Sequence, residues 1–175
     1  MVIHYKNFLP EHKFRPMQEL LLSSGFPYYW QASVGTPEDI SFASLFTHML
    51  VEEVSLQSDP IENYRVQKVF VEPIIDRLNE EHGSVKIIRA KVNLYPYQNE
   101  HMKSSFHIDQ TEKHKVLLLS INTNNGCTEF ENGRIFNAVE NNAIIFNGDL
   151  RHRSVSQTDH AVKVNINVNY ELVEK

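Results

Sequence analysis

The stretch VKIIRAKVNLYPY, residues 85–97, alternates between polar and apolar side chains. Arg89, Lys91, Asn93 and Tyr95 fall on one side of an extended backbone, and the apolar residues between them fall on the other. A helix, with its period of about 3.6 residues, would scatter both sets around its surface. The pattern therefore predicts a β-strand with one apolar face and one polar face.

Further strands are predicted downstream, and turn signals separate them instead of helices. KVLLLSINT (115–123) is typical of a buried strand, and the Asn132-Gly133 pair indicates a tight hairpin between two short strands. Residues 142–156 suggest two strands around a glycine turn, and residues 160–172 alternate again. Six or more short strands without intervening helices predict an antiparallel sandwich or barrel.

The first half of the chain shows helical patterns instead. One helix is expected over about 11–23, and Thr36-Pro37-Glu38-Asp39 is a typical helix start, with a capping threonine, a proline and two acids. The sequence after that start carries an apolar stripe at helical spacing, made of Phe42, Leu45, Phe46, Met49 and Leu50.

A second start signal, Asp59-Pro60, precedes another helical pattern. Its apolar stripe consists of Val66, Val69, Phe70, Ile74 and Leu78, and Pro73 is expected to kink or restart the helix. The length favours one domain, 1–175, with a mainly helical part, 1–84, and a β core, 85–175. The fold class predicted is therefore α+β, with the N-terminal helices packed on one sheet.

Composition narrows the function classes. Hydrophobic residues make up 41% and charged residues 22%, as in ordinary globular proteins. No apolar run reaches the roughly 20 residues of a membrane span, and the N-terminus lacks the pattern of a signal peptide. The single cysteine, Cys127, fits a reducing cytoplasm. The net charge of -5 disfavours a nucleic-acid partner, because such proteins usually carry a basic face.

Three residues are candidate metal ligands. In FHIDQ (106–110), His107 and Asp109 are two residues apart, so their side chains point to the same side of an extended backbone. His152 follows a glycine turn at the start of a later strand. Two histidines and one carboxylate form the facial triad of non-haem Fe(II) oxygenases. The alternative is that these are three polar residues that happen to lie near strand ends.

A lysine interrupts the apolar alternation of VKVNINVNY (162–170). Lys163, Asn165, Asn167 and Asn169 share one face, with valine and isoleucine on the other. One interpretation is the solvated face of an edge strand. The other is a cation at the bottom of a pocket that binds a carboxylate, with Asn165 beside it, because a buried charge requires a partner.

Five segments, in this order, resemble the superfamily of 2-oxoglutarate- and Fe(II)-dependent oxygenases. They are RAKVNLYPY, FHID, LLLSINTNNGCTEFENG, AIIFNGDLRHRSVS and VKVNINVNY. The opening VIHYKNFLP, followed by helices, is similar to small members found in phages and marine bacteria. The resemblance implies a double-stranded β-helix, or jelly-roll, and dioxygenase activity.

The resemblance also implies a role for each candidate. His107, Asp109 and His152 would hold Fe(II), and Lys163 would pair with the far carboxylate of 2-oxoglutarate, beside Asn165. O2 would be the second co-substrate. Many relatives carry arginine where this chain has Lys163, but prolyl-hydroxylase-like members use lysine.

On the strand before the metal motif, Asn93 and Tyr95 are expected to hydrogen-bond the co-substrate; the alternative is cross-strand surface pairing. Arg151 and Arg153 flank His152 and are expected to point away from its face, solvated or ion-paired; the alternative is a role in substrate binding. The patch Tyr28–Trp30 is expected to pack against the helices, the alternative being a substrate lid.

Three functions are compatible with the sequence. The leading one is hydroxylation of a protein side chain, as in prolyl hydroxylases, or of a small metabolite. The second is a non-catalytic cupin-like binding module or a structural virion protein. The third is a nucleic-acid demethylase of the same fold, which the acidic composition disfavours.

Overall fold

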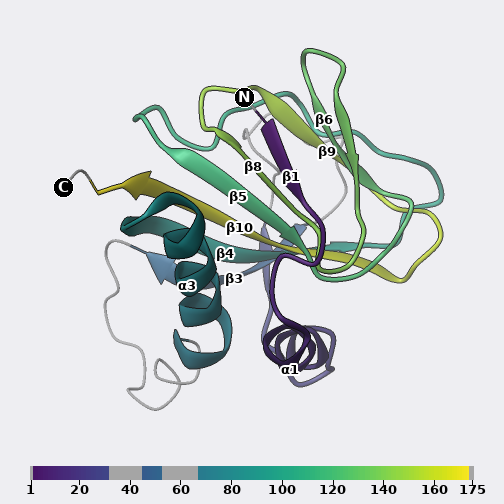
Figure 1. Ribbon diagram of the computed structural model, residues 1–175. Helices are drawn as coiled ribbons and strands as arrows, with labels where there is room; N and C mark the ends of the chain where they lie inside the picture. The colour runs from purple at the N-terminus through teal and green to yellow at the C-terminus, as the bar shows by residue number, and fades with distance from the viewer. Residues whose placement is uncertain (1, 32–44, 53–66, 174–175) are drawn as a thin grey trace.

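The computed structural model describes residues 2–31, 45–52 and 67–173 of the chain (Figure 1). In chain order its elements are β1 (Val2–Tyr5), α1 (Glu11–Leu21), β2 (Tyr29–Gln31), β3 (Leu45–Glu52), the π-helical turn η1 (Gln67–Val71), α3 (Glu72–His82), β4 (Val85–Pro96), β5 (Lys115–Ser120), β6 (Cys127–Phe130), β7 (Ile135–Asn137), β8 (Ala143–Asn147), β9 (His152–Val155) and β10 (Val162–Leu172). None of the described helices is long and apolar enough to cross a membrane.

The strands form two antiparallel sheets. The larger sheet has the order β1-β8-β5-β10-β4-β3-β2, and the smaller has the order β7-β6-β9. An apolar cluster joins them: Val116 and Phe146 of the larger sheet pack with Phe130 of the smaller one. This arrangement confirms the antiparallel sandwich and the jelly-roll that were predicted.

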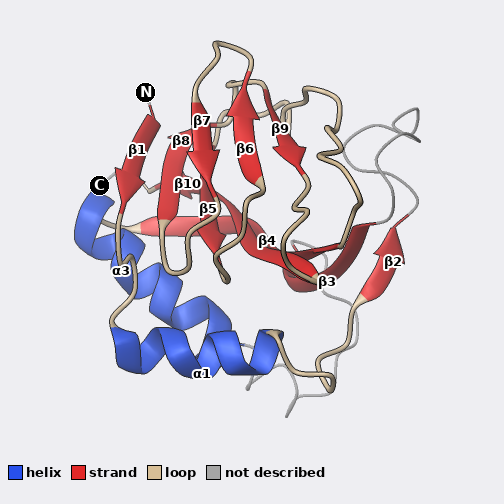
Figure 2. Ribbon diagram, turned by 90° about the vertical axis from the view of Figure 1, so that its right-hand side faces the viewer, coloured by secondary structure: helices blue, strands red, loops and turns tan. Residues whose placement is uncertain are grey.

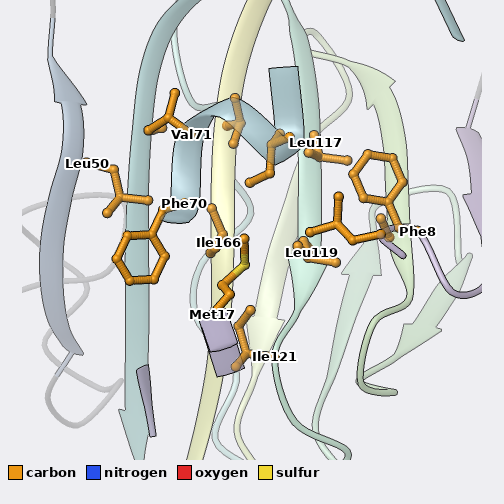
Figure 3. Close-up of a cluster of buried hydrophobic side chains, with 14 of the residues drawn as sticks. Phe8, Met17, Leu50, Phe70, Val71, Leu117, Leu119, Ile121 and Ile166 are labelled. Carbon is orange, nitrogen blue, oxygen red and sulfur yellow. The ribbon is translucent and has the colours of Figure 1, made fainter. Parts of the chain in front are cut away.

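The helices α1 and α3 lie together on the other side of the larger sheet (Figures 1 and 2). Their buried residues, such as Met17 and Leu78, form one cluster with the apolar faces of the central strands. Figure 3 shows Met17 beside Ile166 of β10 and Leu119 of β5 in this cluster. The predicted packing of N-terminal helices on one sheet is thus confirmed.

The segment Leu45–Glu52 corrects the sequence analysis. It was predicted as part of a helix, but it is strand β3, which pairs with both β2 and β4. Over eight residues, the apolar positions of this segment fit the period of a helix as well as that of a strand. The long neighbouring strand β4 supplies a ladder of backbone hydrogen bonds, and this pairing decides the conformation. The helix starts at 36–39 and 59–60 lie outside the described residues.

The other helices agree better with the prediction. The early helix, α1, runs over Glu11–Leu21, and α3 starts at Glu72 with Pro73 in its first turn. Proline has no backbone N–H, which a helix needs in its interior but not at its start. The described part of 1–84 also contains three strands, β1, β2 and β3.

Two aromatic side chains are more exposed than expected. Tyr29 and Trp30, on the edge strand β2, are each 62% exposed, so the predicted packing against the helices is wrong for them. Tyr28 is partly buried against the main core and matches the expectation. The difference follows from β2 being an edge strand, because nothing described covers its outer side.

The hairpin predicted at Asn132-Gly133 is confirmed. Gly133 has a φ of 84°, and its N–H donates to the carbonyl of Phe130 at 2.9 Å. The side chain of Asn132 accepts from the N–H of Arg134 at 3.2 Å. A residue with a Cβ would be strained at this φ, so the glycine is needed for the turn between β6 and β7.

Candidate metal centre

The backbone brings His107 and His152 together from distant parts of the sequence. They form an isolated antiparallel bridge in which each N–H donates to the other's carbonyl at 3.0 Å. Directly paired residues in antiparallel strands point to the same side. The two imidazole rings accordingly lie close together, with their centroids 4.8 Å apart.

Hydrogen bonds orient both rings. His107 Nδ1 lies 3.1 Å from the carbonyl oxygen of Ser105, and His152 Nδ1 lies 3.0 Å from that of Leu150. A carbonyl oxygen only accepts, so in both contacts Nδ1 carries the proton and Nε2 keeps its lone pair. This is the arrangement that metal-binding histidines use, since the second nitrogen fixes the tautomer and the ring orientation.

The carboxylate of Asp109 is the third member of the cluster. Its Oδ2 accepts from Asn167 Nδ2 at 3.0 Å, and its Oδ1 lies 3.6 Å from Arg89 Nη2. Burial by itself raises the pKa of Asp109. The charges of His152, Lys91 and Arg89 and the hydrogen bond from Asn167 lower it by more, so the net shift of the pKa is downward. The carboxylate is therefore ionised at neutral pH, as a metal ligand must be.

Together the three side chains fit a divalent metal. One ligand atom from each of His107, Asp109 and His152 can be chosen so that all lie within 4.8 Å of one another. Burial lowers the pKa of His152, with Asp109 opposing, so this imidazole is neutral and its Nε2 can donate electrons. Two imidazole nitrogens and one carboxylate oxygen are the donor set typical of non-haem Fe(II).

A pocket of about 160 Å³ opens beside this cluster, between the two sheets. Its floor comes from the polar faces of β4 and β10, and its opposite wall from β6 and β9. The lining includes the three candidate ligands and Arg89, Lys91, Asn93, Tyr95, Thr128, Arg153, Ser154, Asn165 and Asn167.

Lys163 is buried at the inner end of this region. It is 3% exposed, and its Nζ donates to Ser154 Oγ at 2.7 Å and to the carbonyl oxygens of Val155 and Cys127 at 2.5 and 3.3 Å. The ammonium also lies 4.6 Å from the centre of the Tyr95 ring, a cation–π contact. Lys163 does not itself line the pocket, but Ser154 and Tyr95 do.

No carboxylate neutralises this ammonium in the described part of the chain. Burial lowers the pKa of Lys163 to about 7. The interpretation of Lys163 as part of a solvated edge is wrong, because β10 lies between β4 and β5 in the centre of the larger sheet. A buried lysine with neutral partners only is the environment in which an added anion would be bound strongly.

The predicted co-substrate residues form one buried network. Asn93 Nδ2 donates to Asn165 Oδ1 at 3.0 Å, and the Tyr95 hydroxyl hydrogen-bonds with Ser154 and Asn165. The interpretation of Asn93 and Tyr95 as surface pairs is wrong, since both are buried. Asn93 Oδ1 is buried and has no partner among the described residues.

Gly126 is necessary for the close approach of β6 to Lys163. A Cβ at this position would lie 2.9 Å from the Lys163 side chain and 2.9 Å from the carbonyl oxygen of Val155. Such contacts would force the lysine out of its present position. Gly126, which directly precedes β6, thus helps to position the Lys163 side chain.

Sequence reasoning missed three contributors. Arg89 and Asn167 hold Asp109, and their places on the polar faces of β4 and β10 were visible in the alternation. Ser154 binds Lys163, and only the folding of β9 against β10 brings it there.

The two arginines beside His152 differ from each other. Arg151 is exposed and pairs with Glu131 at 3.1 Å, as expected. Arg153 pairs with Glu129 and packs over the ring of Phe106 at 4.2 Å, but it also lines the pocket.

Comparison with solved structures identifies the architecture. A 2-oxoglutarate-Fe(II) oxygenase family oxidoreductase from Burkholderia pseudomallei superposes with a TM-score of 0.72 over 97% of this chain and 84% of the other, at 10% identity. The fold is that of the 2-oxoglutarate- and Fe(II)-dependent oxygenases.

Two further neighbours of this fold were solved in complex with different kinds of molecule. A prolyl hydroxylase from Trichoplax adhaerens, solved with a hypoxia-inducible-factor peptide, gives a TM-score of 0.58 at 14% identity and covers 97% of this chain and 82% of its own. The epimerase SnoN, solved with Fe3+, α-ketoglutarate and nogalamycin RO, gives 0.61 at 10% identity and covers 97% and 78%.

Sequence comparison alone finds less. No protein-family model matches the chain. A search of curated proteins also returns no match. The similarity to these structures therefore lies in the fold of the backbone. The chemistry of the site has to be argued from the residues of this chain.

Proposed function

We propose that this protein is a 2-oxoglutarate- and Fe(II)-dependent dioxygenase. The observation that carries the proposal is one pocket with a metal-binding set and a buried cation. His107, Asp109 and His152 converge at its wall, and Lys163 lies at its inner end without a carboxylate partner. A purely structural jelly-roll would have no use for the buried cation, since a buried ammonium without an anionic partner lowers stability.

In this proposal His107, Asp109 and His152 would hold the metal. The Nδ1 hydrogen bonds to Ser105 and Leu150 keep both imidazoles aimed at the ion, and Asn167 keeps Asp109 in place. Bound Fe(II) supplies the redox chemistry that couples O2 to decarboxylation of 2-oxoglutarate and oxidation of a second molecule.

The inner polar network would bind the co-substrate. Lys163 would exchange its carbonyl contacts for the far carboxylate of 2-oxoglutarate, and the Tyr95 hydroxyl and Ser154 are within its reach. Asn93 and Asn165 lie between this end and the metal ligands on the floor of the pocket. Lysine makes a single-point charge contact where arginine would make a fork.

The molecule that is oxidised would be a protein side chain, as in prolyl hydroxylases, or a small metabolite. The neighbours with this fold include a prolyl hydroxylase solved with a peptide and an epimerase solved with nogalamycin RO. Hydroxylation is the reaction we favour for this chain. The gain of one oxygen atom, measured by mass spectrometry on candidate substrates, would identify the substrate.

The test of the proposal is turnover of 2-oxoglutarate to succinate with Fe(II) supplied. Asp109→Ala should abolish turnover and weaken metal binding more than about 100-fold, because loss of a residue that merely supports a ligand already costs 10–100-fold. Asp149→Ala is the matched control, since Asp149 is an exposed carboxylate outside the cluster. Succinate production by Asp109→Ala at the wild-type rate would refute the assignment.

A further inference from the structure

Lys91 is a lysine of the pocket lining, distinct from the buried Lys163. Its side chain lines the pocket between those of Arg89 and Asn93, on the polar face of β4. Lys91 is partly buried and makes no hydrogen bond or ion pair with any residue that the structure describes. Burial lowers its pKa, Arg89 lowers it further, and only Asp109 opposes the shift.

The polar neighbours of Lys91 are already engaged elsewhere. Arg89 lies 3.6 Å from Asp109, and Asn167, directly across the ladder from Lys91, donates to the same carboxylate at 3.0 Å. The Asn93 amide donates to Asn165. Asp109 is thus shared between two residues before any metal binds, and Lys91 is left without an acceptor of its own.

The two lysines lie at different levels of the β4–β10 ladder. Lys163 is opposite Tyr95, whereas Lys91 is opposite Asn167, four residues further along β10. At roughly 3.3 Å per residue this separates the two positions by about 13 Å along the strand. A co-substrate that reaches from Lys163 toward the metal ligands therefore ends before, or at, the level of Lys91.

We propose that Lys91 binds a carboxylate or phosphate group of a ligand other than 2-oxoglutarate. Resting on the function proposed above, this ligand is the molecule that is oxidised, so the substrate is acidic. With a divalent cation and a dianionic co-substrate in place, positive charges would outnumber negative ones among the metal, Asp109, Arg89, Lys91 and Lys163. An anionic substrate group would reduce this excess of positive charge.

The surroundings of Lys91 agree with a substrate position. Its neighbour across the ladder on β3 is Met49, 39% exposed, and Ile108 at the pocket lining is equally exposed. Met49 lies outside the pocket lining, but Ile108 is part of it, so the pocket offers apolar contact in addition to the positive charge of Lys91. A small acid with an apolar portion fits this combination.

The test uses methyl phosphate and propionate as probes, with propionamide as the uncharged counterpart. Each is titrated by NMR into the protein with one equivalent of Zn(II), a diamagnetic substitute for Fe(II), and saturating 2-oxoglutarate, which occupy the three ligands and Lys163. Both anions should bind the wild type better than propionamide does. Lys91→Met should weaken anion binding about tenfold, which corresponds to loss of one charged contact of about 1.4 kcal/mol. Lys91→Arg should largely retain it.

Lys86→Met is the matched control, because Lys86 is an exposed lysine of the same strand that pairs with Glu171. It should leave anion binding unchanged. A second arm measures the affinity of each variant for 2-oxoglutarate itself. Equal anion binding by Lys91→Met and wild type, no anion binding by the wild type, or a tenfold loss of 2-oxoglutarate affinity in Lys91→Met would each overturn the inference.

These results are separable from those of the proposed function. Lys91-dependent anion binding in a protein that makes no succinate supports the anion site and refutes the dioxygenase. If the protein makes succinate and Lys91→Met binds the anions as well as the wild type does, the anion site alone is refuted.

Discussion

On the central strands β4 and β10 the two faces of the larger sheet are both largely buried, but they differ in chemistry. The face toward α1 and α3 is apolar on the central strands, with Val92, Ile166 and Val168 among its members. The face toward the smaller sheet carries Asn93 and Asn165 on the same two strands. Successive residues of one strand thus alternate between a hydrocarbon core and a hydrogen-bonded network.

The difference separates stability from function within single strands. Side chains of the apolar face are stabilised by burial alone and need no specific partner. Side chains of the polar face must be matched donor to acceptor, because an unpaired buried polar group is costly. Two lysines on the polar face lack a charged partner for a salt bridge or hydrogen bond among the described residues: Lys163 has neutral partners only, and Lys91 makes no hydrogen bond or ion pair. These are the places where we expect anionic ligands.

The largest effect is expected from damage to the apolar face. Ile166→Ala should lower the free energy of unfolding by about 2–5 kcal/mol, because it opens a cavity under the helices. Ile166 is fully buried in the main cluster. The measurement is a urea titration, with the exposed Leu172→Ala at the end of the same strand as control. The metal affinity of the folded variant should be unchanged; a matching loss of metal affinity would show that the faces are not independent.

The second-largest effect is expected from substitution of Lys163 on the polar face. Lys163→Ala should raise the 2-oxoglutarate requirement roughly 30-fold or more, since loss of one partner of a buried charge pair costs about 2–5 kcal/mol. Lys163→Arg should do much less harm, although the longer side chain must fit beside Tyr95. Titrating 2-oxoglutarate against all three proteins at saturating Fe(II) measures both. Coincident curves for Ala and wild type would place the co-substrate elsewhere.

A change of pH is expected to have a smaller effect on the affinity for 2-oxoglutarate. The pKa of Lys163 is about 7 without co-substrate, lowered by burial from its ordinary value near 10.5. A bound carboxylate favours the charged form and raises this pKa, so binding takes up a proton once the pH exceeds about 7. Affinity for 2-oxoglutarate should therefore fall above pH 7, by at most tenfold per pH unit.

Anaerobic calorimetry of the metal-loaded protein from pH 6.5 to 8.5 would measure this dependence. Lys163→Arg provides the comparison, because its guanidinium stays protonated over the whole range. A flat profile for wild type would show that Lys163 is already fully charged, or does not contact the co-substrate.

The sequence alone determined the alternation of β4 and β10, because a period of two is a local property of extended backbone. It also indicated the His107–Asp109 pair, whose spacing places both side chains on one side. The hairpin at Asn132-Gly133 and the restart of the helix at Pro73 are equally local and were predicted correctly.

Only the tertiary structure decided the rest. Whether Leu45–Glu52 is a helix or a strand depended on pairing with β4, which no local pattern reports. The bridge between His107 and His152 joins residues that only the closed jelly-roll makes neighbours. The polar face of β10 is buried, not solvated, because β4 and β5 flank it and the smaller sheet covers it. Burial is a property of the assembled layers, and it is burial that makes Lys91 and Lys163 candidates for anion binding.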